Sequence, residues 1–345
     1  MASGSAVKDE TSKGGRSAKM ERRIVYLDLN HIINLAKQEK AGNDGLLTRI
    51  KSLATSGAVV FPITAAHIIE ISSISKQNQR TDLSETIDAI SRGYILRSFQ
   101  DMMFLEVLEA TADFYGRQGV EVAKDIVLMR GYSQAFGEIQ VDFTPWRNID
   151  PEKSKIAEAM FWDAALGKAG LDVLLAKHFP KPADQGKEHQ EFIIATENDR
   201  RSSANKTIKE KEEKCVVGLL QHMIKNFFSA ANKLGISMLE ITGNPPRKFW
   251  TYEFMAGLPT IDVWSKMHVY LYHDPNRPVK VNHVYDIAHL SVALPYCDVV
   301  VCDSEMEHVV KQSKLDRRYN VAVFSKLTAA LDFLEAVGGA EGRES

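Results

Sequence analysis

The chain has 345 residues, 44% of them hydrophobic, and its formal net charge at pH 7 is −2. This length is enough for two ordinary domains, and the near-neutral charge excludes a protein that is basic over its whole surface, so a nucleic-acid partner needs a local basic patch. No apolar run approaches the ~20 residues of a membrane span and the N-terminal region lacks the core of a signal peptide, so we expect a cytoplasmic protein without a membrane partner. The three cysteines show no metal-ligand spacing and are expected to be free thiols.

The N-terminal part of the chain predicts a disordered tail followed by alternating strands and helices. Residues 1–21 are rich in Ser, Gly, Lys and Ala, with almost nothing to bury. The first part of an α/β domain is expected over 22–98. Its first strand is apolar and ends at Asp28, and Asn30 is expected to cap the next helix.

A second short apolar strand is expected over 58–63, and the helix after it is capped by Thr64. That helix carries Glu70 between two isoleucines. A carboxylate inside an apolar helical run is costly unless it is paired, exposed or bound to a metal. Glu70 is therefore either a surface residue of an amphipathic helix or part of a site.

The middle of the chain, 99–262, is predicted to be a large all-helical insertion. Helical spacing of apolar residues is expected over 102–114, 120–135, 154–168, 171–178 and 215–234. The stretch 247–252 interleaves bases with aromatics, which suits either nucleobase stacking or packing of the aromatics in a core.

The α/β pattern returns over 263–338, before a short tail at 339–345. Residues 266–272 are compatible with a helix or a strand. A helix is expected to open at Asp286 and to stop at Pro295, and the apolar strand that follows ends at Asp303. A last strand at 321–324 and a closing helix complete the pattern.

Four carboxylates, from Asp28, Glu70, Asp286 and Asp303, are expected to converge on the carboxyl edge of a parallel sheet, where ligands bind in open α/β folds. At ~4 Å and an effective dielectric constant of ~20, each like-charged pair costs about 4 kcal/mol, so the cluster must protonate, move apart or bind a cation. Hard oxygen donors favour Mg²⁺ or Mn²⁺. Taken singly, the three aspartates are equally compatible with helix caps.

At motif level the chain resembles the PIN-like domain nucleases. The resemblance is carried by 26–30, by Glu70 in its Ile-rich helix, by 285–289 and by 297–303, and it covers about 22–97 and 263–336. It implies a three-layer α/β/α fold with a central parallel sheet and divalent-metal-dependent cleavage of RNA, less often DNA. The family's acids fall on Asp28, Glu70, Asp286 and Asp303, with Asn30 at the small polar position.

Several assignments stay open. Asp163 in the helical insertion is a rival third acid, and Glu305 could share or displace the last ligand. Arg277, Lys280 and His289 are candidates for substrate contact. Asn30 could instead orient Asp28 or touch the scissile phosphate.

Three functions are weighed from these residues. The first is a metal-dependent endoribonuclease, which the resemblance links to toxins and antiviral-defence effectors held by a regulatory partner. The insertion would then be the docking surface for that partner or for a second copy of the chain. The second is an inactive PIN-like module that binds RNA or protein. The third is a haloacid-dehalogenase-type phosphatase, disfavoured because Asn30 stands where that chemistry needs a second acid.

Overall fold

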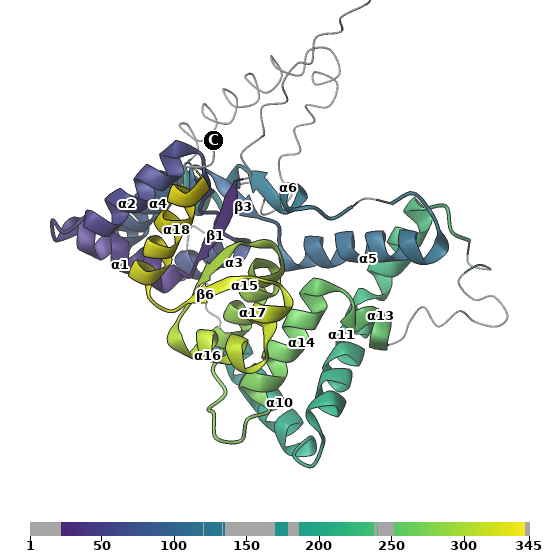
Figure 1. Ribbon diagram of the computed structural model, residues 1–345. Coiled ribbons are helices and arrows are strands. Elements are labelled where there is room, and N and C mark those ends of the chain that lie inside the picture. Colours follow the sequence, from purple (N-terminus) through teal and green to yellow (C-terminus); the bar gives the residue numbers. More distant parts are fainter. Residues whose placement is uncertain are drawn as a thin grey trace, which may run out of the picture.

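The computed structural model describes residues 22–119, 121–132, 134, 170–178, 186–237, 240 and 252–341. In this part of the chain, helices surround a small central sheet (Figure 1). Its four strands are all parallel and pair in the order β2-β1-β5-β6. Their bounds are Arg23–Leu27 for β1, Val59–Val60 for β2, Val299–Val301 for β5 and Ala322–Phe324 for β6. The predicted mixed α/β chain with a central parallel sheet is confirmed at this level.

Both faces of this sheet are buried, because successive strand side chains point in opposite directions and each set meets helices. The first hydrophobic core receives Val25, Leu27, Val299 and Val301. The second receives Ile24, Tyr26, Val300 and Val323. Strands covered on both faces read as continuous apolar runs, which is why the sequence alone located β1 and β5.

The first core is closed by helices from both ends of the chain and by one helix from its middle. Apolar residues of these helices recur at helical spacing and pack against the strands. The helices are α1 (Leu29–Lys40), α2 (Gly45–Ser56), α3 (Ala65–Ser72), α4 (Gln77–Ser91), α9 (Leu171–His178) and α18 (Leu327–Glu341).

The second core lies on the other face and is built by helices that follow the insertion, together with the start of α5. These helices are α5 (Phe99–Tyr115), α14 (Pro259–Tyr272), α15 (Asn282–Tyr296), α16 (Ser304–Gln312) and α17 (Leu315–Arg318). A third core joins α5 and α14 to α11 (Ile208–Lys233) and α13 (Tyr252–Ala256). The segment 266–272, left open between helix and strand, is therefore helical.

The region expected to be all helical contains a strand. β4 (Leu128–Arg130) pairs antiparallel with β3 (Tyr94–Leu96), and neither strand was predicted. The expected helix over 120–135 is wrong, because α6 (Lys124–Val127) ends where β4 begins and is the only α-helix among the described residues of this stretch. The cause is tertiary: Ile63 exchanges backbone hydrogen bonds with β3 on one side, which leaves the other edge of β3 for β4 to pair.

Some expectations lie outside the described residues: the tail at 1–21, the helix at 154–168 with Asp163, and the basic–aromatic stretch at 247–251. The expected boundary between insertion and second α/β part, at 262, falls inside α14. None of the described helices is both long and apolar enough for a membrane crossing.

Candidate active site

Asp28 lies directly after β1, and its backbone continues the pairing of the strand by donating to the Val301 carbonyl oxygen at 2.8 Å. It occupies the N-cap position of α1, yet its side chain makes no capping hydrogen bond. Asn30 does not cap the helix, because α1 already begins at Leu29. The Asn30 amide instead donates to Asp28 Oδ2 at 3.2 Å, so it orients the carboxylate, as one of the two alternatives proposed.

Asp303 enters from the neighbouring strand. Leu27 and Val301 are paired residues at the ends of β1 and β5, which brings the segments that follow them to the same edge of the sheet. Asp303 caps α16, since its Oδ1 accepts from the Met306 amide at 2.8 Å. The cap uses Oδ1 and leaves Oδ2 of Asp303 outside the capping interaction.

Glu70 is held by a chain of hydrogen bonds that the sequence did not reveal. His289 Nε2 lies 3.2 Å from Glu70 Oε1, and His289 Nδ1 lies 2.5 Å from the hydroxyl of Thr64. Thr64 caps α3 by accepting from the His67 amide, so its own proton is available for His289 Nδ1. His289 is 2% exposed, and its two ring nitrogens face Glu70 and Thr64, so it holds Glu70 in place. Its expected contact with substrate stays a prediction.

A stack of aromatic rings supports this chain. The ring centroids of His67 and His289 are 4.4 Å apart, and Tyr26 stacks on His67 at 5.4 Å. His67 Nδ1 accepts from the Thr64 amide, so its proton lies on Nε2, which faces the Tyr26 hydroxyl at 3.4 Å. Burial, followed by the charge of His289, holds the pKa of His67 well below its usual value, so His67 is neutral.

The pKa of Asp286 is affected by all the other acids of the site. It lies one turn inside α15, which begins at Asn282, so the expectation that it opens the helix is wrong and a capping role is excluded. Burial, followed by the negative charges of Asp28, Asp303, Glu70 and Glu305 in that order, raises the pKa of Asp286 to about 8. The four expected acids therefore act on one another, with Glu305 as a fifth.

Arg277 and Lys280 are directed to Glu305. Lys280 Nζ lies 2.7 Å and Arg277 Nη1 3.4 Å from its carboxylate, and His283 Nε2 lies 3.5 Å away. The hydrogen bond from Lys280 holds the pKa of Glu305 below its usual value against the opposing effect of burial. The two cations expected to meet phosphate thus neutralise the fifth acid at the rim of the site.

The acids are close enough to affect one another electrostatically, but their carboxylate oxygens are not clustered closely enough to surround one ion. Among the described residues, only Cys215, His268 and His273 bring three potential ligand atoms within 4.8 Å of one another. The acid cluster fits a hard cation by donor type and by uncompensated charge, and its side chains would have to draw together around such an ion.

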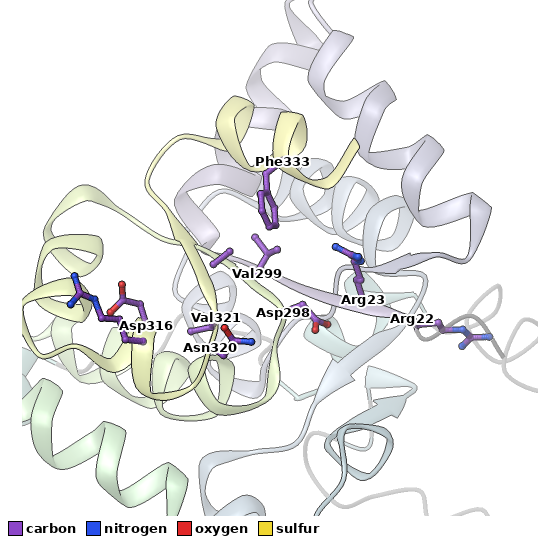
Figure 2. Close-up of a pocket in the computed structure, with 10 residues that line it drawn as sticks. Arg22, Arg23, Asp298, Val299, Asp316, Asn320, Val321 and Phe333 are labelled. Carbon is purple, nitrogen blue, oxygen red and sulfur yellow. The ribbon is translucent and has the colours of Figure 1, made fainter. Parts of the chain in front are cut away.

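A pocket of about 550 Å³ lies at the opposite, amino edge of the sheet (Figure 2). It is lined by residues that start three strands, Arg23, Val299 and Ala322, and by Asp298. Asp298 is already engaged there, because it accepts from the Ile24 amide at 2.8 Å and pairs with a lysine of α6. This pocket is therefore separate from the acid cluster, and no expected site residue lines it.

Comparisons of the chain with protein-family models, with curated proteins and with solved structures find no match. The resemblance to PIN-like nucleases is carried by the sequence motifs alone.

Proposed function

We propose that the protein is a divalent-metal-dependent endonuclease of PIN-like architecture that hydrolyses phosphodiester bonds in RNA. One observation carries the proposal: the paired ends of β1 and β5 bring Asp28 and Asp303 to the carboxyl edge of a parallel sheet, and their charges act with that of Glu70 on Asp286. A group of acids that are buried or half-buried and repel one another is retained at a cost to stability, and perturbed carboxyls of this kind mark functional sites.

The four carboxylates of Asp28, Glu70, Asp286 and Asp303 would hold Mg²⁺ or Mn²⁺. When bound, such an ion supplies Lewis-acid stabilisation of phosphate oxygens and lowers the pKa of an attacking water. Asn30 fixes the orientation of Asp28, and the Thr64–His289 pair fixes that of Glu70. Arg277 and Lys280 stand at the rim, where exchange of Glu305 for a phosphate would let them bind the RNA backbone.

The proposed biological role is that of a toxin or antiviral-defence effector, and it rests on the resemblance alone. In that role the helical insertion would bind a regulatory protein or a second copy of the chain. The third core, where α11 packs on α5 and α14, holds the helices of this insertion in place for such a contact.

The test is cleavage of end-labelled single-stranded and hairpin RNA, and of matched DNA, by the full-length chain with Mg²⁺ or Mn²⁺. Wild type is expected to cut RNA, and Asp28→Asn and Asp286→Asn are expected to lose at least ~100-fold in rate, as removal of a principal electrostatic group does. Asp113→Asn, an exposed acid of α5, is the matched control and should cut normally.

Two results would overturn this proposal. The first is an absence of cleavage with either metal. The second is cleavage by Asp28→Asn at the wild-type rate. RNA binding in the absence of any Mg²⁺ or Mn²⁺ affinity, measured by calorimetry, would favour the inactive binding module instead.

A further inference from the structure

A second group of potential metal ligands lies in the helical part of the molecule, apart from the acids. It consists of Cys215 on α11, His268 on α14 and His273, the residue that caps the C-terminus of α14. Their ligand atoms all lie within 4.8 Å of one another, and Cys215 Sγ lies 3.2 Å from His268 Nδ1. No other described group of three or more such residues meets this spacing.

A fourth donor is already at the cluster. Asp199, on α10 (Gly186–Ser202), places Oδ2 3.3 Å from His273 Nε2. Its other oxygen pairs with Lys214, whose ammonium also reaches the hydroxyls of Ser202 and Ser203 at 3.1 and 3.0 Å. Lys214 therefore keeps two acceptors if Asp199 turns toward an ion.

His273 supplies an independent sign that a ligand is missing. Its side chain is 2% exposed, yet Nδ1 has no hydrogen-bond partner among the described residues, and Nε2 has the Asp199 carboxylate at 3.3 Å in a geometry that makes no hydrogen bond. A buried polar atom without a partner costs about 1–3 kcal/mol, and such atoms in native proteins point to an unseen water or ion.

The protonation states suit metal binding. Burial, with a further contribution from His273, lowers the pKa of His268 to about 4, and burial also lowers the pKa of His273. Both imidazoles are therefore neutral at pH 7, the form that binds metals. The Cys215 thiol, whose pKa burial raises to about 12, must release its proton to solvent when a metal binds.

We propose that Cys215, His268, His273 and Asp199 bind one zinc ion that ties α10 and α11 to the C-terminal end of α14. A thiolate with two imidazoles is a donor set for Zn²⁺ and not for Mg²⁺ or Mn²⁺. Zinc–ligand bonds of ~2.0–2.3 Å in a tetrahedron place ligand atoms roughly 3.3–3.8 Å apart. The 4.8 Å limit met by Cys215, His268 and His273 requires only small shifts of these three side chains. Asp199 lies outside that limit and reaches His273 alone, at 3.3 Å, so its carboxylate would have to turn toward the ion.

The site is structural, because four protein ligands leave no position for a substrate. Its position at the end of α14 indicates that it stabilises the packing of neighbouring helices. α14 packs against α15, which carries Asp286 and His289, while α11 packs against α5. A zinc ion at the far end of α14 would fix the insertion to the helix that supports the acid cluster. This inference does not depend on nuclease activity.

The experiment loads chelator-stripped, full-length protein with Zn²⁺ or Co²⁺. Mass spectrometry of the metal content is expected to give one Zn²⁺ per chain. Co²⁺ should give the absorption of a tetrahedral ion with a thiolate charge-transfer band. Cys215→Ser should abolish that band and weaken Zn²⁺ binding more than ~100-fold, since loss of a group that only orients a ligand already costs about 10–100-fold.

Matched variants separate this site from the rest of the molecule. Cys297→Ser and His308→Gln change the same residue types elsewhere and should keep the band, as should Asp286→Asn in the acid cluster. His273→Gln is a second ligand variant for the case in which Cys215→Ser fails to fold, with circular dichroism as the check on folding. Zinc well below one per chain in wild type, or binding unchanged in folded His273→Gln, would overturn the proposal.

Discussion

Asp286 combines burial with four like charges, and its pKa of about 8 has a consequence for folding. The native metal-free protein keeps a proton that the unfolded chain, with an ordinary aspartate pKa near 3.8, has lost above that pH. The free energy of unfolding therefore falls as pH rises from about 4 to about 8. A bound cation removes this penalty.

We predict that Asp286→Asn is more stable than wild type at pH 8 in the presence of chelator, by about 1–3 kcal/mol, the worth of one or two pKa units. At pH 5, where Asp286 is protonated, the two proteins should differ little. Urea unfolding at both pH values measures this, with Asp113→Asn as the control. An Asp286→Asn variant that loses stability equally at both pH values contradicts the electrostatic account.

Glu305 controls the two cations at the rim of the site. Glu305→Gln removes the charge that holds Arg277 and Lys280, which leaves Lys280 free for phosphate and Arg277 paired with Asp274 alone. Under the proposed function, we predict that this variant binds single-stranded RNA about 3–10-fold more tightly in chelator and with a steeper salt dependence.

Fluorescence anisotropy at several salt concentrations measures the RNA affinity of Glu305→Gln. Glu335→Gln is the matched control, because Glu335 also pairs with an arginine, Arg49, but on the surface of α18. Equal affinities for wild type and Glu305→Gln would show that the two cations do not contact RNA.

The positions of individual site residues were only partly predictable from the sequence. Asp28 and Asp303 were located because they end apolar strands, a local signal. The Thr64–His289–Glu70 chain and the pairing of Glu305 with two cations depend on contacts between distant elements, to which no local pattern points. Cys215 and His268 lie 53 residues apart, so their proximity had no sequence signature.

Among the elements, α14 depends on a residue from another helix. Its N-cap, Leu258, has no side chain that can cap, and the first helical residue is a proline. Glu106 of α5 takes the role: its buried carboxylate accepts from the Thr260 amide at 3.0 Å and from the Tyr296 hydroxyl at 2.7 Å. A carboxylate at a helix N-terminus is favoured by the helix dipole, and here it also joins α5, α14 and α15.

We predict that Glu106→Ala loses about 2–4 kcal/mol of unfolding free energy, because it leaves buried donors of Thr260 and Tyr296 without an acceptor. Burial raises the pKa of Glu106 to about 7 from 4.5. Its contribution to stability therefore declines as pH rises from about 4.5 to about 7 and is constant above.

Glu106→Gln cannot titrate and should lack this part of the pH dependence, while it retains one acceptor oxygen. Unfolding in urea across pH 5 to 8 compares the two variants with wild type, and Asp113→Asn, an exposed acid on the same helix, is the control. A Glu106→Gln protein that keeps the wild-type pH dependence contradicts the assignment of that slope to Glu106.

At the scale of the whole molecule, the sequence predicted the parallel sheet but not the antiparallel pair of β3 and β4. β1 and β5 are almost fully buried and carry continuous apolar runs, whereas β3 and β4 are less buried and owe their conformation to their pairing with each other. The relation of the insertion to the sheet was equally unpredictable. It is set by a shared core in which α5 and α14 belong to both parts.

The pairing of β1 with β5 has a consequence for folding during protein synthesis, because the two strands are far apart in the chain. The Ile24 amide donates a hydrogen bond to the carboxylate of Asp298, which is 274 positions later in the chain. At translation rates of ~5–20 residues per second, the ribosome needs roughly 15–50 seconds to deliver β5 after β1 has emerged. During that interval the apolar edge of β1 is open to the wrong neighbours, so newly made chains should depend on holding chaperones far more than the finished protein does.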